Sequence, residues 1–300
     1  MTVINTNTAA TLTANALSKN ERDMSQAMER LSTGQRINSA RDDAAGLAIS
    51  SKMTSQINGL NMAVRNASDA ISMVQTADGA LIEVSDMLQR MRELSVQAAS
   101  DTNQASDRVA LNTEYEAIRD EITRIAVNTE FNGSAVFGQG SIDTSAYQVG
   151  ANASQTISVA FGNFNAGVSA GAAGLGGNTV STAASSFKVL ARTGGTTDIA
   201  STDLLSRANA TLSLEVISSA ITAVNTERAT YGAAINRLEY ASDNLANVSQ
   251  NASASRSRIL DADYASETTE LARTQIIQQA GTAMLSQANQ QAQSVLALLK

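Results

Sequence analysis

The fold is decided by residues 49–98, which read ISSKMTSQINGLNMAVRNASDAISMVQTADGALIEVSDMLQRMRELSVQA. Apolar side chains recur from Ile49 to Ala98 at steps of three or four residues, and 14 steps cover 49 residues, an average of 3.5. This is the period of a left-handed coiled coil. Because residues 38–43 supply capping and acidic side chains and no proline interrupts the pattern, we expect one helix from about residue 42 to about residue 100.

The length of this helix sets the architecture. At 1.5 Å per residue it is roughly 85 Å long, whereas a globular chain of this size has a diameter of roughly 50 Å. Gly59 and Gly79 lie inside the pattern, but each costs only about 1 kcal/mol relative to alanine, so one continuous helix is expected. The molecule is therefore predicted to be a rod.

The rest of the chain predicts a path that runs out along the rod and returns. A second helix is expected over about residues 104–128, a turn into a hairpin at residues 131–134, and coiled-coil spacing again over residues 217–245. The intervening stretch 139–202 is rich in Gly, Ser and Thr with short alternating runs, which indicates a small β-rich insert. The predicted fold is mainly α, an elongated antiparallel coiled-coil rod with paired N- and C-terminal segments and a β-rich inserted outer domain. The predicted domains are residues 1–41 with 256–300 as an inner terminal coiled coil, 42–138 with 203–255 as a helical rod with a β-hairpin, and 139–202 as the outer domain.

Composition excludes several kinds of chemistry. The chain has no Cys, His, Pro or Trp, which removes disulfides, thiol nucleophiles, imidazole bases and the usual zinc ligands. A net charge of −7 disfavours nucleic acid. Seven glutamines between residues 274 and 299 argue against a membrane span. We therefore expect no catalytic, metal or cofactor site, no nucleic acid and no membrane among the partners.

The two ends of the chain are expected to associate. Residues 1–18 and 274–299 carry no charged side chain, and both ends contain apolar stripes at helical spacing. A pair of Ala- and Gln-rich helices buries too little surface to offset the entropy of ordering, so we expect the ends to be disordered in the monomer and to fold on association. The predicted assembly residues are Leu17, Met24, Met28, Leu31, Leu285, Val295, Leu298 and Leu299.

A charged cluster on the long helix has two interpretations. The spacing of Arg90, Glu93, Leu94 and Gln97 is expected to place them along one helix face. They are either a solvated face with local ion pairs or a docking surface for another subunit or a receptor. Periodicity alone favours the solvated face.

The chain resembles bacterial flagellins, the subunits of the flagellar filament. The resemblance rests on residues 3–7, 29–34, 36–46, 129–133 and 288–299, and it extends over roughly residues 1–138 and 203–300. Residues 139–202 match no motif, as is usual for a variable outer domain. The short insert and the final Lys300, where arginine is common, are departures from the family pattern.

The resemblance implies a function and a set of partners. The chain would be secreted, exported unfolded by the flagellar type III apparatus, and assembled with copies of itself into an extracellular filament for motility. Implied partners are an export chaperone at the C-terminal helix, the filament cap and junction proteins, and Toll-like receptor 5. The family's receptor patch matches Arg90, Leu94 and Glu114, and this match favours the docking interpretation, with Gln97 on the same face.

Two other functions stay open at this point. A hook–filament junction protein resembles flagellin at both ends, although the intact stretch 38–46 argues against it. A flagellin-like cell-surface receptor would need residues 139–202, rather than the ends, to bind a ligand.

Overall fold

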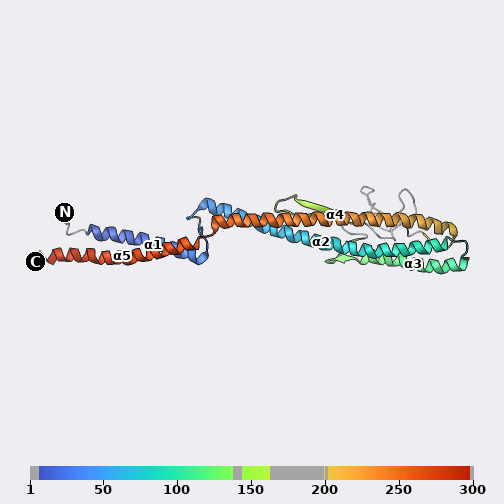
Figure 1. The fold of residues 1–300 in the computed structure, drawn as a ribbon, viewed down its shortest axis with the longest axis horizontal. Coiled ribbons are helices and arrows are strands. Elements are labelled where there is room, and N and C mark those ends of the chain that lie inside the picture. The colour runs from blue at the N-terminus through green and yellow to red at the C-terminus, as the bar shows by residue number, and fades with distance from the viewer. Residues whose placement is uncertain (1–6, 138–143, 163–198, 200–201, 298–300) are drawn as a thin grey trace, which may run out of the picture. The chain divides into compact units, whose positions relative to one another are not determined.

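The computed structural model describes residues 7–137, 144–162, 199 and 202–297 (Figure 1). The chain divides into two compact units: a terminal unit, Met1–Asn58 with Val248–Lys300, and a central unit, Gly59–Asn247. Each unit is described by itself below.

Three long helices confirm the sequence-based expectation of a mainly helical fold. They are α2 (Ala44–Ala98), α3 (Ala105–Asn128) and α4 (Arg207–Leu260). The first begins where predicted because the Asp43 Oδ1 atom accepts a hydrogen bond from the backbone N–H of Gly46, at 2.9 Å. The second begins with a capping box between Gln104 and Asp107. Gly59 and Gly79 lie within α2, which is one helix as predicted.

The predicted hairpin at residues 131–134 is also confirmed. Strands β1 (Glu130–Phe131) and β2 (Ser134–Ala135) pair in antiparallel fashion. The two turn residues, Asn132 and Gly133, have φ angles of 52° and 74°. Positive φ at both positions is the requirement of a two-residue type I′ turn, which Asn-Gly meets better than most dipeptides.

A second hairpin lies in the predicted β-rich insert. Strands β3 (Thr144–Gln148) and β4 (Thr156–Ala160) are antiparallel, with Cα partners running from Thr144↔Ala160 to Gln148↔Thr156. Its apolar face packs onto the helices: Val159 is buried, and the Phe161 ring lies 5.6 Å from that of Tyr231 in α4. Most of the remaining insert lies outside the described residues.

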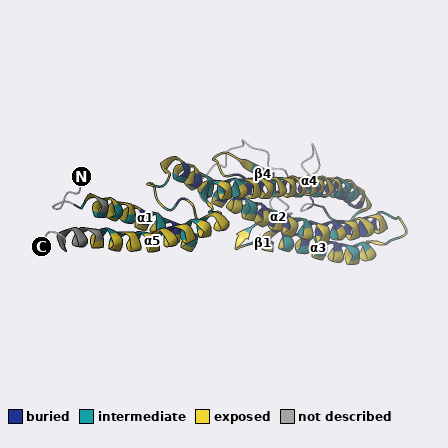
Figure 2. Ribbon diagram, turned by 60° about the vertical axis from the view of Figure 1, so that its left-hand side comes forward, coloured by how far each residue is buried: buried dark blue, intermediate teal, exposed yellow. Residues whose placement is uncertain are grey.

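The core of the central unit forms where α2, α3 and α4 turn their apolar stripes toward one another (Figure 2). The predicted stripe of α2 is buried almost continuously from Ile57 to Ala98. Ile49, by contrast, is exposed, since Gly46 and Ser50 take the inward positions of the first turns. The largest fully buried side chains of the central unit are Leu81, Leu88, Met91, Leu94, Tyr115, Ile122, Phe137, Ile199, Leu204, Ile217 and Tyr231.

The terminal unit pairs the two ends of the chain, as the sequence predicts. Helix α1 (Thr8–Thr33) lies beside α5 (Tyr264–Ala297) in antiparallel orientation (Figure 1). The Asn7 side chain donates to the Ala288 carbonyl at one end, at 3.2 Å, and the Tyr264 hydroxyl donates to the Leu31 carbonyl at the other, at 2.9 Å. After Gly34, which ends α1 in the left-handed conformation with φ 70°, Gln35 forms a β-bridge with Asp261.

Candidate functional site

The α1–α5 pair is the first candidate surface, because it brings together most of the predicted assembly residues. Leu17, Met24 and Leu31 are half-buried along the contact with α5, and Leu285 is half-buried on α5 itself. The two helices approach each other closely at Leu17 and Gly281. A Cβ atom added to Gly281 would lie only 3.1 Å from the Cδ1 atom of Leu17. Val295 belongs to α5, and Leu298 and Leu299 lie outside the described residues.

Met28 does not lie in the contact between α1 and α5. Its side chain is 54% exposed, whereas its neighbour Ala27 is buried. The buried and half-buried positions of α1 include residues 24, 27 and 31, which follow heptad spacing. Position 28 therefore lies beside this row of residues and not in it. Met28 is therefore available to a partner rather than to α5.

Sequence reasoning missed the most buried polar residues of this pair. Asn20 is 5% exposed and Thr274 is fully buried, and the Asn20 Nδ2 atom donates to the Thr274 carbonyl at 2.8 Å. Both residues continue the heptad spacing of their helices, but a search for apolar side chains passes over them. The spacing itself was the signal that could have found them.

The outer faces of the same two helices carry exposed apolar side chains. Leu12 on α1 and Ile276 and Met284 on α5 are more than half exposed, in stretches of the helices that have no charged side chains. Apolar surface that lacks neighbouring charge is a feature of association sites. The pair therefore presents one apolar face inward and another outward.

The second candidate surface is an ion-pair cluster on α2 and α3 of the central unit. The Arg90 guanidinium donates to Glu114 Oε1 from Nε at 2.9 Å and from Nη2 at 2.8 Å, and to Glu93 Oε2 from Nη1 at 2.9 Å. The hydrogen bonds that Arg90 donates to Glu114 and then to Glu93 raise the pKa of Arg90 above its ordinary value. The structure thus brings Arg90 and Glu114 together, although they are 24 residues apart in sequence.

The other two predicted members of this cluster differ from each other. Gln97 is exposed on α2, so it shares the solvent-facing side with Arg90. Leu94 is only 1% exposed and belongs to the helical core. Leu94 is therefore a core side chain and not an exposed member of the cluster, because position 94 also belongs to the apolar stripe of α2, which is buried against the other helices.

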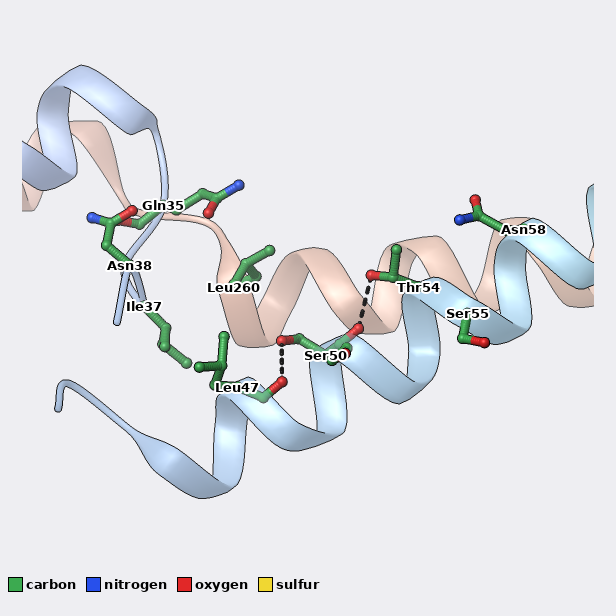
Figure 3. A pocket seen from close by; sticks show the side chains of 10 residues that line it. Gln35, Ile37, Asn38, Leu47, Ser50, Thr54, Ser55, Asn58 and Leu260 are labelled. Carbon is green, nitrogen blue, oxygen red and sulfur yellow. Dashed lines mark hydrogen bonds between the residues drawn. The ribbon is translucent and has the colours of Figure 1, made fainter. Parts of the chain in front are cut away.

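A pocket of about 550 Å³ lies in the terminal unit, where residues 35–38 pass between the start of α2 and the end of α4 (Figure 3). Its walls are neutral: Ile37, Leu47 and Leu260 supply apolar surface, and Ser50 and Thr54 bond to backbone carbonyls. The Ser50 hydroxyl donates to the Leu47 carbonyl, and the Thr54 hydroxyl to the Ser50 carbonyl. None of the lining residues is an acid or a base, so the pocket provides no group for proton transfer.

Neither a metal centre nor a membrane span emerges from the described part of the chain. Within these residues, no group of three or more His, Cys, Asp and Glu side chains could hold an ion. No described helix has a long enough apolar stretch to cross a bilayer. The acids near helix starts have structural roles: the Asp42 carboxylate accepts hydrogen bonds from the backbone N–H groups of Ser39, at 3.0 Å, and Asn38, at 3.2 Å. The bond from Ser39 contributes most to lowering the pKa of Asp42 below its ordinary value.

Comparison with known families identifies both ends of the chain. Residues 4–141 match the bacterial flagellin N-terminal helical region, and residues 214–299 match the bacterial flagellin C-terminal helical region. The two matched regions contain nearly all of α2, α3, α4 and α5. They also contain both candidate surfaces.

Whole-chain relatives agree with the family models. The chain is 43% identical to a flagellin of Bacillus subtilis, with 99% of each chain covered, and 43% identical to a flagellin of Halalkalibacterium halodurans, with 92% of this chain and 91% of the relative covered. Among solved structures, a putative flagellar hook-associated protein from Vibrio parahaemolyticus is similar with a TM-score of 0.56. The similarity covers 73% of this chain and 100% of the Vibrio protein at 15% sequence identity, so it supports the fold alone.

Proposed function

The chain belongs to the bacterial flagellin family, structural and non-enzymatic subunits of the extracellular flagellar filament, and from this premise we propose which surfaces join one subunit to the next. We propose that the α1–α5 pair forms the inner assembly domain and that its outward apolar side chains bind neighbouring copies. The observation that carries this proposal is the presence of exposed apolar side chains in the uncharged stretches of the two helices, residues 8–18 of α1 and 274–297 of α5. Leu12, Ile276 and Met284 are exposed in these stretches, and Met28 is exposed farther along α1, beside Glu29 and Arg30.

The proposal assigns the predicted domains to layers of the filament. Residues 1–41 with 256–300 form the inner layer, 42–138 with 203–255 the packed shell, and 139–202 the outer surface. Export of the unfolded chain by the flagellar type III apparatus fits this assignment, because helices that bury so little surface unfold at low cost. An export chaperone would then bind the C-terminal helix, and the cap and junction proteins would contact the subunits at the filament ends.

Seeded growth tests the assembly role. The full chain and a version without residues 1–20 and 280–300 are mixed with short filament seeds at moderate salt and imaged by negative-stain electron microscopy. We expect long filaments from the full chain only, while circular dichroism reports a folded central unit in both. Growth by the truncated chain would contradict an assembly role for the ends. Failure of both folded chains to grow would favour the junction-protein or receptor alternative.

We further propose that the ion-pair cluster binds Toll-like receptor 5 in the free subunit. The contact would use Arg90, Glu114 and Gln97, whose side chains are exposed, and the same face would be covered by a neighbouring subunit in the filament. Leu94 would contribute indirectly, because its buried side chain positions α2 rather than touching a partner.

Receptor binding by monomeric variants tests this second role. Arg90→Ala, Gln97→Ala and Glu114→Ala are expected to weaken binding to the receptor ectodomain, with the largest loss for Arg90→Ala because it removes the charge shared by both acids. The matched control is Arg124→Ala, which breaks another exposed ion pair, with Glu121, on α3. Equal binding by all four variants would contradict the proposal.

A further inference from the structure

The contact between α1 and α5 is a heptad seam on both sides, and its centre is polar. On each helix the buried and half-buried positions recur at steps of three and four residues. This is the spacing of coiled-coil core positions. The seam positions are Ala10, Thr13, Leu17, Asn20, Met24, Ala27 and Leu31 on α1, and Glu267, Leu271, Thr274, Gln278, Gly281, Leu285 and Ala288 on α5.

Asn20 and Thr274, which together we term the polar layer, are more buried than the leucines on either side of them. The Asn20 amide donates across the seam to the backbone carbonyl of Thr274 at 2.8 Å. The Thr274 hydroxyl turns back to its own helix, 2.9 Å from the carbonyls of Glu270 and Leu271. The small threonine side chain is therefore directed away from the path by which Asn20 reaches the backbone.

An apolar residue would bury more favourably at position 20, so the asparagine costs stability. In coiled coils a single buried asparagine at a core position is known to restrict the register and the number of strands, at a cost in stability. The cost is useful where apolar packing alone does not distinguish between alignments. The seam of α1 and α5 is such a case, because alanine and half-buried leucine recur along both helices.

Contacts on either side of the polar layer belong to the same alignment. Leu17 fits against Gly281, where a Cβ would lie only 3.1 Å from its Cδ1 atom. At the other end Arg30 Nη1 pairs with Glu267 Oε1 at 3.1 Å, with both side chains mostly buried. A slip of one heptad toward the C-terminus of α5 would move Asn20 to Gly281, Leu17 to Ala288 and Arg30 to Thr274, which leaves the arginine without its carboxylate.

We propose that Asn20 and Thr274 specify the register in which the N-terminal and C-terminal helices of this chain pair. Residues 1–18 and 274–299 carry no charge, so this part of the seam cannot reject a misaligned partner by electrostatic repulsion, and many copies of both ends meet in a filament. The polar layer contributes selectivity, because a slip of one heptad breaks the hydrogen bond between the Asn20 amide and the Thr274 carbonyl together with the Arg30–Glu267 pair. This inference concerns the pairing within one subunit and goes beyond the proposed role of the ends in joining subunits.

Cysteine cross-linking measures the register directly, since the chain has no cysteine of its own. One double variant, Leu17→Cys with Gly281→Cys, reports the observed alignment. Another, Leu17→Cys with Ala288→Cys, reports a slip of one heptad, about 10 Å along the helix axis. Each pair is placed in three backgrounds: the unsubstituted chain, Asn20→Leu, and the control Asn15→Leu, which makes the same replacement at an exposed position of α1.

The variants are co-assembled as a small minority with unsubstituted chains, so filament growth does not depend on them and links between two variant chains are rare. After oxidation, denaturing electrophoresis and peptide mass spectrometry quantify the intrachain disulfide. We expect Asn20→Leu to raise the slipped cross-link about tenfold over the unsubstituted background, the factor that corresponds to about 1.4 kcal/mol. Asn15→Leu should leave it unchanged.

Two results would overturn the proposal. One is a slipped cross-link that stays at its background level in Asn20→Leu while the observed alignment remains fully linked. The other is exclusion of Asn20→Leu chains from filaments that accept Asn15→Leu chains, because the polar layer would then govern incorporation and not register. Growth of unsubstituted filaments is the independent control on the assembly role itself.

Discussion

The helical core of the central unit and the α1–α5 pair of the terminal unit are both built from heptads, yet they bury very different surfaces. In the central unit, three helices and a hairpin enclose large side chains such as Leu88, Tyr115 and Ile217 completely. In the α1–α5 pair, the buried residues, among those whose burial is described, are Ala27, Asn20 and Thr274, and none of them is large and apolar. Figure 2 shows this contrast as dark interiors against helices that are mostly exposed.

The difference teaches that heptad spacing and independent stability are separate properties. A helix pair can satisfy the geometry of a coiled coil while small and polar residues leave it with little hydrophobic stabilisation. Such a pair gains most of its stability from further copies that cover its outer face. A subunit that polymerises benefits from having both kinds of region.

The largest expected effect comes from a cavity in the central core. Leu88→Ala should lower the free energy of unfolding of the monomer by about 2–5 kcal/mol, because it removes a fully buried side chain. Urea unfolding followed by circular dichroism measures the loss. The matched variant Leu17→Ala in the α1–α5 pair should leave this transition nearly unchanged. Equal losses in the two variants would remove the contrast between the regions.

A smaller effect is expected from one buried hydrogen bond in the same core. The hydroxyl of Tyr115 lies 2.7 Å from that of Thr202, which donates to the Ile199 carbonyl, so Tyr115 donates to Thr202. Tyr115→Phe should cost about 1 kcal/mol, since the ring still fills its space but the bond is lost. Thr202→Val in the Tyr115→Phe background tests the assignment. If Thr202→Val lowers the free energy of unfolding as much in the Tyr115→Phe background as in the unsubstituted chain, the two groups are not coupled.

The pH dependence should differ in sign between the two units. Burial raises the pKa of the Glu227 carboxyl above its ordinary value. The native state then binds this proton more tightly than the unfolded state. Protonated Glu227 therefore stabilises the native state at low pH, and this stabilisation is lost as the pH rises through the raised pKa. Relative to Glu227→Gln, the native chain should lose stability as the pH rises from the ordinary glutamate pKa through the raised one. We expect a change smaller than that of Leu88→Ala.

Asp42 in the terminal unit provides the opposite case. Its pKa is lowered by hydrogen bonds, so its contribution is present above the ordinary aspartate pKa and is lost as the pH falls through the lowered one. Measuring Asp42→Asn and Glu227→Gln against the unsubstituted chain across the same pH range compares the two signs. If the free energy of unfolding of a variant changes with pH in the same way as that of the unsubstituted chain, the pKa shift assigned to the substituted residue is contradicted.

The smallest expected effect on stability is at the Arg90 cluster. Its ion pairs are exposed, and exposed pairs contribute little to folding. Arg90→Ala and Glu114→Ala should leave the Tm of the monomer unchanged within error, while weakening receptor binding. A clear drop in Tm would mean that the cluster holds α2 and α3 together and would favour the purely structural interpretation.

Much of the fold could be predicted from the sequence because long heptad stripes permit few arrangements. The extents of α2 and α3, the Asn132-Gly133 turn and the pairing of the chain ends all follow from spacing and turn chemistry. The direction of individual side chains was harder to predict. Residue spacing places Leu94 beside Arg90 and Met28 in an apolar stripe, whereas the packing of each helix decides which neighbour these side chains face.

Heptad spacing can place Asn20 and Thr274 in the seams of their own helices, but it cannot show that the two residues meet. Asn20 and Thr274 are 254 residues apart, and neither has the apolar character by which seam positions are recognised. Their proximity follows from the register of α1 against α5, which depends on Leu17, Gly281 and Arg30 as well. Only the assembled pair reveals which alignment satisfies all of these contacts.

Hydrogen exchange of monomer and filament tests the central claim most directly. Amides of α1 and α5 should exchange almost unprotected in the monomer and become strongly protected in the filament. Amides of α2, α3 and α4 within residues 59–247 should be protected in both. Protection of α1 and α5 in the monomer equal to that of α2 would contradict the account, because the terminal pair would then be stable without its neighbours.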